Sequence, residues 1–268
     1  MEEAGTAAFS RVLDGKRALV IGGGGGGIGR AISVRLATAG SAVAVADVDR
    51  GRADEAAAEV EAAGARSVAL VGDVSARGGA EALVHQAADA LGGLDVLVTV
   101  VGGQLAFVPA ALVHETADED WDLMFDLNLR YVAEAVRAVL RVFLARGTGG
   151  TIVSVGSIAG VAGSPGQAAY GAAKAGLANL ARSVAVEYGR HGIRMNVVAC
   201  GPISTPVAAA AQAGSALDWI PLGRAGSTRE VADAAVFLAS PLSSYISGQN
   251  LVVDGGATAA GPFPLQEG

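Results

Sequence analysis

Two side chains with complementary proton chemistry, Tyr170 and Lys174, stand one helical turn apart. The apolar pattern predicts a helix over residues 168–188, so this spacing places both side chains on one face. A phenol has a pKa near 10, and a nearby ammonium favours its phenolate form. Such a tyrosine can take a proton from an alcohol or return one to a carbonyl. Lysine occurs only at positions 16 and 174, whereas arginine supplies the other positive charges, so its use here needs a reason.

Ser157 and Asn128 are candidates to complete this group. The run over residues 151–156 predicts a buried strand, which delivers Ser157 at its carboxyl end, where its hydroxyl could bind the reacting oxygen. Asn128 lies within a predicted helix over residues 119–146, although asparagine is a poor residue inside helices. The apolar residues that flank it indicate a largely buried position rather than a solvated side chain.

A run of six glycines, residues 22–27, follows a predicted strand over residues 17–21 and precedes a predicted helix over residues 28–39. The run fits more than one phosphate-binding spacing, and a flexible loop is the alternative. The flanking strand and helix favour a dinucleotide site, because a pyrophosphate binds the N–H groups at a helix N-terminus. Asp47 closes the next predicted strand, residues 42–46, near the offset expected of an acid that binds ribose hydroxyls.

Strands and helices continue to alternate after Asp47. We expect helices over about residues 53–63 and 77–91, and strands over residues 67–71 and 94–101. This alternation predicts a single-domain α/β fold, a Rossmann-type doubly wound parallel sheet with ligands at the carboxyl ends of the strands. Asp73 follows one of those ends. It could cap the next helix, but its position at the same edge as the glycine turn favours contact with adenine.

Composition restricts the class of protein. The 268 residues are 51% hydrophobic, and we expect one domain over residues 14–268 after a lead-in over residues 1–13. The net charge of −7 argues against nucleic acid or a membrane surface as partner. No apolar run is long enough to span a membrane, and the acidic start is unlike a signal peptide. The single cysteine excludes an internal disulfide, so we expect a cytoplasmic protein. This cysteine and the three scattered histidines also form no metal-binding spacing, so we expect no metal.

These motifs resemble those of the short-chain dehydrogenase/reductase family, of the single-domain type, over about residues 16–256. The family's T-G-x-x-x-G-I-G is similar to residues 22–29, and its P-G-x-[IV]-x-T to residues 200–205. Its helix asparagine, its serine and its Y-x-x-x-K pair are matched by Asn128, Ser157, Tyr170 and Lys174. The resemblance implies an oxidoreductase that uses a nicotinamide cofactor, with Tyr170 as general acid/base and Asn128 holding a water in a proton relay.

The same resemblance implies which residues bind the cofactor. Ile203 and Thr205 would hold the nicotinamide carboxamide, and Lys174 would also bind the nicotinamide ribose. The expected cofactor-binding residues are Gly23, Gly27, Ile28, Gly29, Asp47, Val48, Asp73, Val74, Val100, Gly102, Tyr170, Lys174, Ile203 and Thr205.

Charge predicts NAD rather than NADP as the cofactor. Asp47 can accept hydrogen bonds from both hydroxyls of the adenosine ribose, whereas it would repel a 2′-phosphate. The two positions that could supply a compensating cation hold Gly26 and Val48. Arg50 could weaken the argument by folding back towards Asp47, although Asp49 beside it adds negative charge.

Three positions depart from the family pattern. Gly22 stands where the family usually has threonine, Thr-Val-Val-Gly at residues 99–102 replaces N-N-A-G, and Cys200 replaces proline. Backbone contacts to the cofactor at Val100 need no side chain and are expected to survive. None of these positions transfers a proton, so we expect the changes to affect local rigidity rather than catalysis.

The substrate is expected to be a small hydrophobic secondary alcohol or ketone, because mostly apolar segments should enclose it. These segments are residues 104–107, 158–163 and 204–224, the last containing Trp219. An NADPH-dependent 3-oxoacyl reductase and a non-catalytic NAD-sensing protein are the alternatives, the second disfavoured by the intact catalytic set. The resemblance also implies a homotetramer, in which the apolar residues after Gly256 could dock on a neighbouring subunit.

Overall fold

A seven-stranded parallel sheet forms the centre of the protein in the computed structural model, which describes residues 11–104, 106–206 and 217–259. Its strand order is β3-β2-β1-β4-β5-β6-β9. The strands are β1 (Arg17–Ile21), β2 (Ala42–Asp47), β3 (Ser67–Val71), β4 (Val96–Thr99), β5 (Gly150–Ser157), β6 (Ile193–Cys200) and β9 (Asn250–Val253). The order reverses between β1 and β4, which confirms the predicted doubly wound fold. Two short strands, β7 (Ile203–Ser204) and β8 (Gly226–Ser227), pair beside it.

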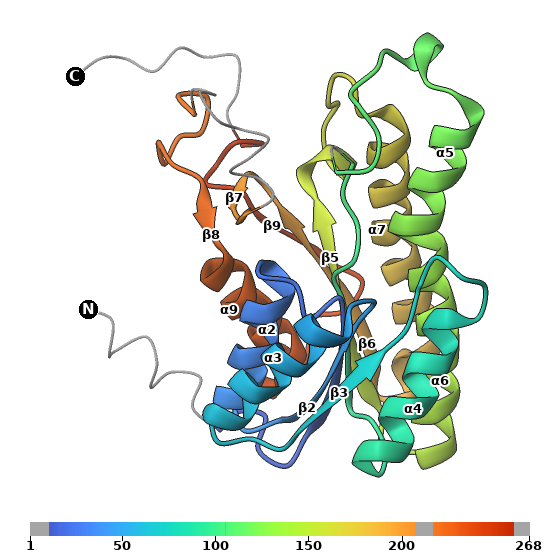
Figure 1. Ribbon diagram of the computed structural model, residues 1–268, viewed down its shortest axis with the longest axis vertical. Helices are drawn as coiled ribbons and strands as arrows, with labels where there is room; N and C mark the ends of the chain where they lie inside the picture. Colours follow the sequence, from blue (N-terminus) through green and yellow to red (C-terminus); the bar gives the residue numbers. More distant parts are fainter. Residues whose placement is uncertain (1–10, 105, 207–216, 260–268) are drawn as a thin grey trace.

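Helices cover both faces of this sheet (Figure 1). One face carries α2 (Ile28–Thr38), α3 (Arg50–Ala62) and α9 (Thr228–Ala239). The other carries α4 (Gly79–Leu91), α5 (Asp118–Phe125), α6 (Tyr131–Arg146) and α7 (Ala168–Tyr188). Short helical turns are η1 (Val113–Glu115), η3 (Ile158–Gly160), η4 (Gly189–His191) and η5 (Pro241–Ser243).

Each face has its own apolar core, because successive strand residues point to opposite sides. In β1, Leu19 and Ile21 pack with α4, α6 and α7, whereas Ala18 and Val20 pack with α2 and α9. All four side chains are buried. The sheet is therefore enclosed, and its carboxyl edge is the place where loops can form a site.

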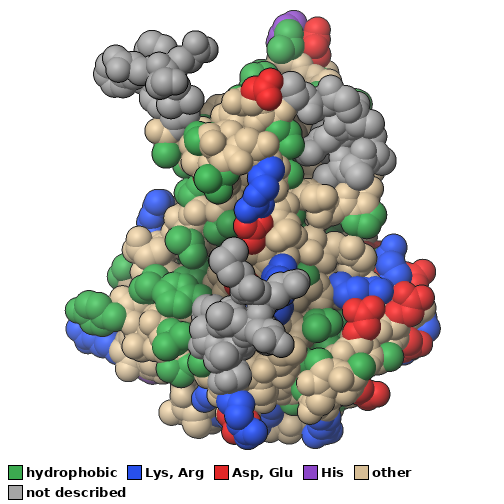
Figure 2. All heavy atoms as spheres, turned by 90° about the vertical axis from the view of Figure 1, so that its left-hand side faces the viewer, with side chains coloured by type: hydrophobic (Ala, Val, Ile, Leu, Met, Phe, Trp, Pro, Cys, Tyr) green, Lys and Arg blue, Asp and Glu red, His purple; other side chains and the backbone are tan. Residues whose placement is uncertain are grey.

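Arginine charges on the side of α2, α3 and α9 are largely paired with carboxylates, and Figure 2 shows blue and red side chains next to one another there. Arg30 lies 3.0 Å from Glu55, and Arg35 lies 2.6 Å from Asp233. No helix among the described residues is long and apolar enough to cross a membrane. The described residues also contain no cluster of three or more His, Cys, Asp or Glu side chains that could hold a metal.

The long helix predicted over residues 119–146 is interrupted by a π-helical turn, η2 (Asp126–Arg130), between α5 and α6. The Asn128 amide lies within this turn and donates to the Met124 carbonyl at 3.0 Å. A side-chain donor at this carbonyl competes with the backbone ladder, which explains why the helix is not regular here. The predicted long helix is therefore present from Asp118 to Arg146, with a π-helical turn that the sequence pattern did not indicate.

Candidate active site

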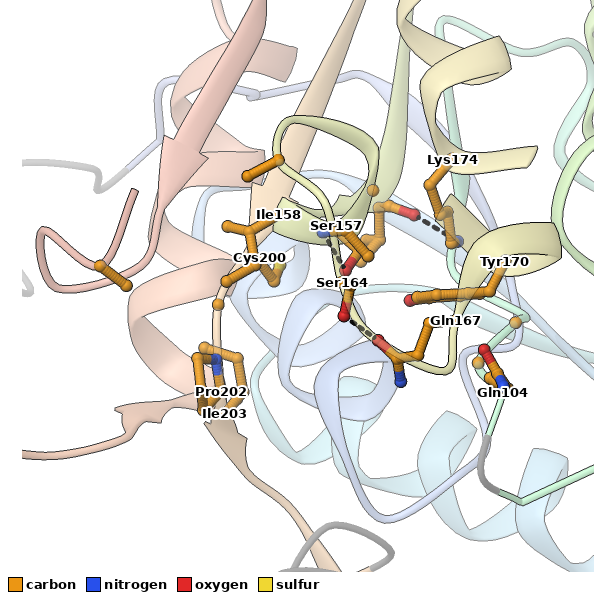
Figure 3. Close-up of a pocket in the computed structure, with 18 of the residues that line it drawn as sticks. Gln104, Ser157, Ile158, Ser164, Gln167, Tyr170, Lys174, Cys200, Pro202 and Ile203 are labelled. Atoms are coloured by element: carbon orange, nitrogen blue, oxygen red, sulfur yellow. Dashed lines mark hydrogen bonds between the residues drawn. The ribbon is translucent and has the colours of Figure 1, made fainter. Parts of the chain in front are cut away.

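A cavity of about 830 Å³ opens at the carboxyl ends of β4, β5 and β6 (Figure 3). Among the predicted site residues, those that line it are Ile28, Val100, Gly102, Ser157, Tyr170, Lys174, Ile203 and Thr205. Trp219 and Gln104 also line it, as expected for the substrate walls. Residues 207–216 of the predicted wall lie outside the described residues.

Tyr170 and Lys174 lie one turn apart on α7 and face the cavity, as the spacing predicted. The ammonium of Lys174 is 5.7 Å from the centre of the Tyr170 ring and donates to the Val155 carbonyl at 3.0 Å. Ser157 ends β5, and its Oγ accepts the Ala159 N–H at 3.1 Å. The three side chains from β5 and α7 thus meet in one cavity, with the Lys174 ammonium fixed by a backbone carbonyl.

Burial determines the proton affinities of this pair. It raises the pKa of Tyr170, and a hydrogen bond with the Ser157 side chain only partly opposes this effect. It also lowers the pKa of Lys174 to about 8. The expected net lowering of the Tyr170 pKa is therefore not found, because the loss of solvent is the largest effect on this phenol. Tyr170 is a protonated phenol at neutral pH, in the form that can donate a proton.

Asn128 is fully buried and holds the backbone of the loop that follows β4. Its Oδ1 accepts the Gly103 N–H at 3.0 Å, and its Nδ2 donates to the Gly103 carbonyl at 3.2 Å. Gly102 has a φ of +143°, and a Cβ there would come within 2.4 Å of the Asn128 amide oxygen. Only glycine allows this approach, so Asn128 and Gly102 act together to shape the cavity floor.

The glycine turn leads directly into the N-terminus of α2. Gly27 is the N-cap residue, so that no side chain at this position occupies the first N–H groups of the helix. A Cβ at Gly29 would lie 2.0 Å from the Gly22 carbonyl, and one at Gly24 would lie 2.8 Å from Asp47 Cβ, whereas one at Gly25 would meet nothing within 4 Å. The turn is therefore tightly packed on the protein side and open on the other. This arrangement fits a pyrophosphate bound by the N–H groups of the first turn.

Asp47 is 9% exposed at the end of β2, where a ribose-binding acid was predicted. The arginine that folds back onto it is Arg52, whose Nη2 lies 2.8 Å from Asp47 Oδ1, and not Arg50. Arg50 lies 3.8 Å from Asp54 instead. The reason is the start of α3: Asp49 accepts the Arg52 N–H at 2.8 Å and caps the helix, so that Arg52 is directed back along β2.

The remaining predicted cofactor residues do not line the cavity and follow β1, β2 and β3 at the same edge of the sheet. They are Gly23, Gly27 and Gly29 in the turn, Asp47 and Val48 after β2, and Asp73 and Val74 after β3. Asp73 does not cap α4, whose N-cap residue is Gly78. Its Oδ1 accepts both the N–H and the hydroxyl of Ser75, at 2.8 and 2.6 Å, and these bonds lower its pKa.

Two residues that were not identified from the sequence hold the carboxyl end of β4 in place. This strand end lacks the side-chain amides of the family's N-N-A-G motif. The Tyr131 hydroxyl donates to the Val101 carbonyl at 2.7 Å, and the Thr99 hydroxyl donates to Ser154 Oγ at 2.9 Å. An aromatic residue in an apolar helix carries no signal of this role. Cys200, the third departure, is buried in the cavity wall, and burial raises its pKa to about 12, so that it is a neutral thiol.

The departures at Gly22 and in residues 99–102 are coupled in space. Gly22 has a φ of +86°, and a Cβ there would lie 2.8 Å from Val101 Cγ2. A threonine at position 22 and a valine at position 101 could not both occupy this backbone. The small residue in the turn therefore makes room for the larger one after β4.

Comparisons with known proteins agree over most of the chain. A family model described as enoyl-(acyl carrier protein) reductase matches residues 23–258. The chain is 40% identical over 247 residues to cis-4-hydroxycyclohexanecarboxylate dehydrogenase of Sinomonas cyclohexanicum, covering 91% of this chain and 97% of that protein. It is 36% identical over 259 residues to glucose 1-dehydrogenase of Gluconobacter oxydans (strain 621H), covering 93% and 94%. A solved short-chain type dehydrogenase/reductase from Mycobacterium marinum has a TM-score of 0.84 at 31% identity, with 94% and 98% covered.

Proposed function

Because this chain belongs to the short-chain dehydrogenase/reductase family and is an oxidoreductase of that type, we propose that it interconverts a secondary alcohol and a ketone with NAD. The proposal rests on one observation above all, the presence of Ser157, Tyr170 and Lys174 in a single cavity that the first residue of α2, Ile28, also lines. A nucleotide-binding protein without catalysis has no need of a buried phenol beside a buried lysine.

In the proposed mechanism of ketone reduction, the protonated Tyr170 gives its proton to the ketone oxygen, and the Ser157 hydroxyl orients that oxygen. In the reverse direction the Tyr170 phenolate receives the proton of the alcohol. A bound nicotinamide would supply or accept the hydride. Lys174, held by the Val155 carbonyl, places a positive charge beside the Tyr170 ring, where it would favour the negative charge that forms when Tyr170 loses its proton. Asn128 holds the Gly103 backbone and so keeps the cavity floor in place.

Asp47, the glycine turn, Ile203 and Thr205 would hold the cofactor. All the hydrogen bonds that Asp47 accepts from described side chains and backbone go to Oδ1, which leaves Oδ2 for a ribose hydroxyl. Arg52 offsets part of the negative charge, so the repulsion of a 2′-phosphate is smaller than Asp47 alone would give. The carboxylate is the more buried partner of this pair, and this supports NAD as the preferred cofactor.

The cavity walls support a mainly hydrophobic substrate. Most of the lining side chains between β4 and β7 are aliphatic or small, as with Val155, Ile158 and Ala162. Two of the relatives are named for the oxidation of ring alcohols, a hydroxycyclohexanecarboxylate and glucose, which supports a ring-sized substrate for this chain.

We also propose a homotetramer, because apolar side chains are exposed on the outer helices of one face. Val186 on α7 is 85% exposed, and Leu123 on α5 and Leu144 on α6 are exposed as well. Burial of such side chains against a second copy would remove apolar surface from water. The predicted docking of the residues after Gly256 concerns residues 260–268 for the most part, which lie outside the described residues.

The experiment that tests the proposal follows absorbance at 340 nm with a panel of secondary alcohols and ketones, and with both cofactors. We expect NAD to be preferred in kcat/KM, by less than the roughly hundredfold that an unpaired Asp47 would give, because Arg52 offsets part of the like-charge repulsion. A kcat/KM for NADP equal to that for NAD would contradict the role of Asp47. Activity confined to 3-oxoacyl substrates with NADPH would favour a 3-oxoacyl reductase, and NAD binding without any turnover would favour a sensor.

A further inference from the structure

Gln104 carries a buried hydrogen-bond acceptor that has no partner. Its side chain is 7% exposed and lines the cavity at the start of the loop after Gly103. Its Nε2 donates to the carbonyls of Gly166 at 2.8 Å and Pro109 at 3.3 Å. Among the described residues, no group donates to its Oε1. Buried polar atoms are nearly always satisfied, so this one calls for a donor from a bound water or from a substrate group that replaces that water.

The orientation of this amide is determined by its neighbours. If the amide were flipped, Oε1 would face the Gly166 and Pro109 carbonyls, which are both acceptors, and Nε2 would lose both bonds. The Gln104 Oε1 must therefore be the amide atom that points away from these two carbonyls. Figure 3 shows it turned towards Tyr170, with the nitrogen turned away.

A second glutamine in the wall, Gln167, lacks this constraint. Its Oε1 accepts the Ser164 hydroxyl at 2.6 Å, but a hydroxyl can donate or accept, so the amide could be reversed without loss. Gln167 can therefore adapt to either kind of ligand group. Of these two glutamines, Gln104 presents the fixed requirement, and that requirement is for a hydrogen-bond donor.

The charge of the cavity narrows the chemistry of that donor. Lys174 is the only charged side chain among the described residues of the lining, and it lies beside Tyr170 at the reacting end. A carboxylate elsewhere on the substrate would find no cation and would meet the Gln104 oxygen as a second acceptor. An ammonium would find no carboxylate in this lining. A neutral hydroxyl satisfies the acceptor and needs no counter-charge.

We propose that Gln104 selects neutral substrates with a second hydroxyl group, which donates to its Oε1 while Tyr170 acts on the first. This inference rests on the proposed alcohol–ketone activity and names its substrate class. Only the first carbinol is oxidised, and the second hydroxyl is left unchanged. Gln104 is thus a specificity-determining residue, and its bonds to Gly166 and Pro109 hold its acceptor in place.

The test compares kcat/KM with NAD for cyclohexanol, for the 1,2-, 1,3- and 1,4-cyclohexanediols and for 4-hydroxycyclohexanecarboxylate. We expect the best diol to exceed cyclohexanol by at least tenfold in the wild-type protein, and the hydroxy acid to be poorer than that diol. Gln104→Met has a similar size but no acceptor, so the diol-to-cyclohexanol ratio should fall towards one. Gln249→Met is the matched control, because Gln249 does not line the cavity, and it should keep the ratio.

The diol-to-cyclohexanol ratio of kcat/KM distinguishes a loss of specificity from a general disturbance of the loop, because a loosened loop would slow the reaction of both alcohols alike. Equal kcat/KM for diols and cyclohexanol in the wild-type protein would overturn the inference, as would an unchanged ratio in Gln104→Met. If Gln104→Met does not fold, the wild-type ratio alone decides. Calorimetric titration of the diols with NADH present adds a binding readout. If the diols bind and Gln104→Met weakens this binding, but no alcohol is turned over, the proposed activity is refuted and the inference is supported. If the diols neither bind nor are turned over, both the proposed activity and the inference are refuted.

Discussion

Gly22→Ala is expected to destabilise the protein through contacts that the structure makes explicit. Gly22 has a φ of +86°, which L-residues with a Cβ adopt only with strain. The added Cβ would also lie 2.8 Å from Val101 Cγ2 and 3.0 Å from the Val101 backbone nitrogen. The first effect costs about 1–2 kcal/mol and the second about 1–3 kcal/mol. We therefore expect the free energy of unfolding to fall by roughly 2–5 kcal/mol.

The partner in this contact provides a direct check. Val101→Ala removes the methyl group that the new Cβ would meet, but it leaves the strained φ and the backbone contact. The double variant Gly22→Ala/Val101→Ala should therefore be more stable than the sum of the single effects predicts, by about 0.5–2 kcal/mol. Gly25→Ala is the matched control from the same turn, because its Cβ would meet nothing within 4 Å and its φ lies outside the left-handed region.

Urea denaturation at one fixed protein concentration measures all four variants against the wild type. Gly25→Ala should change the free energy of unfolding by less than about 0.5 kcal/mol. Strictly additive effects in the double variant, or a Gly22→Ala variant as stable as Gly25→Ala, would refute the coupling between the turn and the strand end.

Three further outcomes are expected from the charges and surfaces of the protein. Burial lowers the Lys174 pKa from 10.5 to about 8, so the unfolded chain binds more protons between these values. The free energy of unfolding of the wild type, relative to Lys174→Met, should rise with pH through that window, and a pH-independent difference would contradict this. Arg52→Ala should lower kcat/KM for NADP relative to NAD several-fold, because it removes the charge that offsets Asp47, whereas Arg50→Ala should not. If both variants change this cofactor preference equally, Arg52 does not offset the repulsion of the 2′-phosphate. Light scattering at micromolar concentration should give about four times the 26.4 kDa of one chain, and a monomer mass would exclude the tetramer.

The main architecture could be predicted because it depends on local patterns. The apolar runs of β1 and β5 and the period of α7 are visible in the sequence, and Tyr170 and Lys174 share a face because of their spacing alone. The structure accordingly brings both into one cavity with Ser157.

What could not be predicted depends on contacts between distant segments. The π-helical turn forms because Asn128 binds both Met124 and the Gly103 backbone, which lies 25 residues away. Arg52 rather than Arg50 reaches Asp47, because the cap of α3 sets the direction of the side chain. The raised pKa of Tyr170 follows from its depth in the cavity. No spacing rule contains this information, since burial is a property of the assembled fold.

The most direct test of the proposed chemistry is the kcat of Tyr170→Phe with NAD and the best alcohol of the panel. The variant keeps the ring but loses the proton carrier, so we expect kcat to fall by about 10²- to 10⁴-fold while NAD binding is retained. Tyr188→Phe, on the same helix, is the matched control and should stay within about twofold of the wild type, because Tyr188 lies at the far end of α7 and does not line the cavity. More than half the wild-type turnover in Tyr170→Phe would contradict the assignment of Tyr170 as general acid/base.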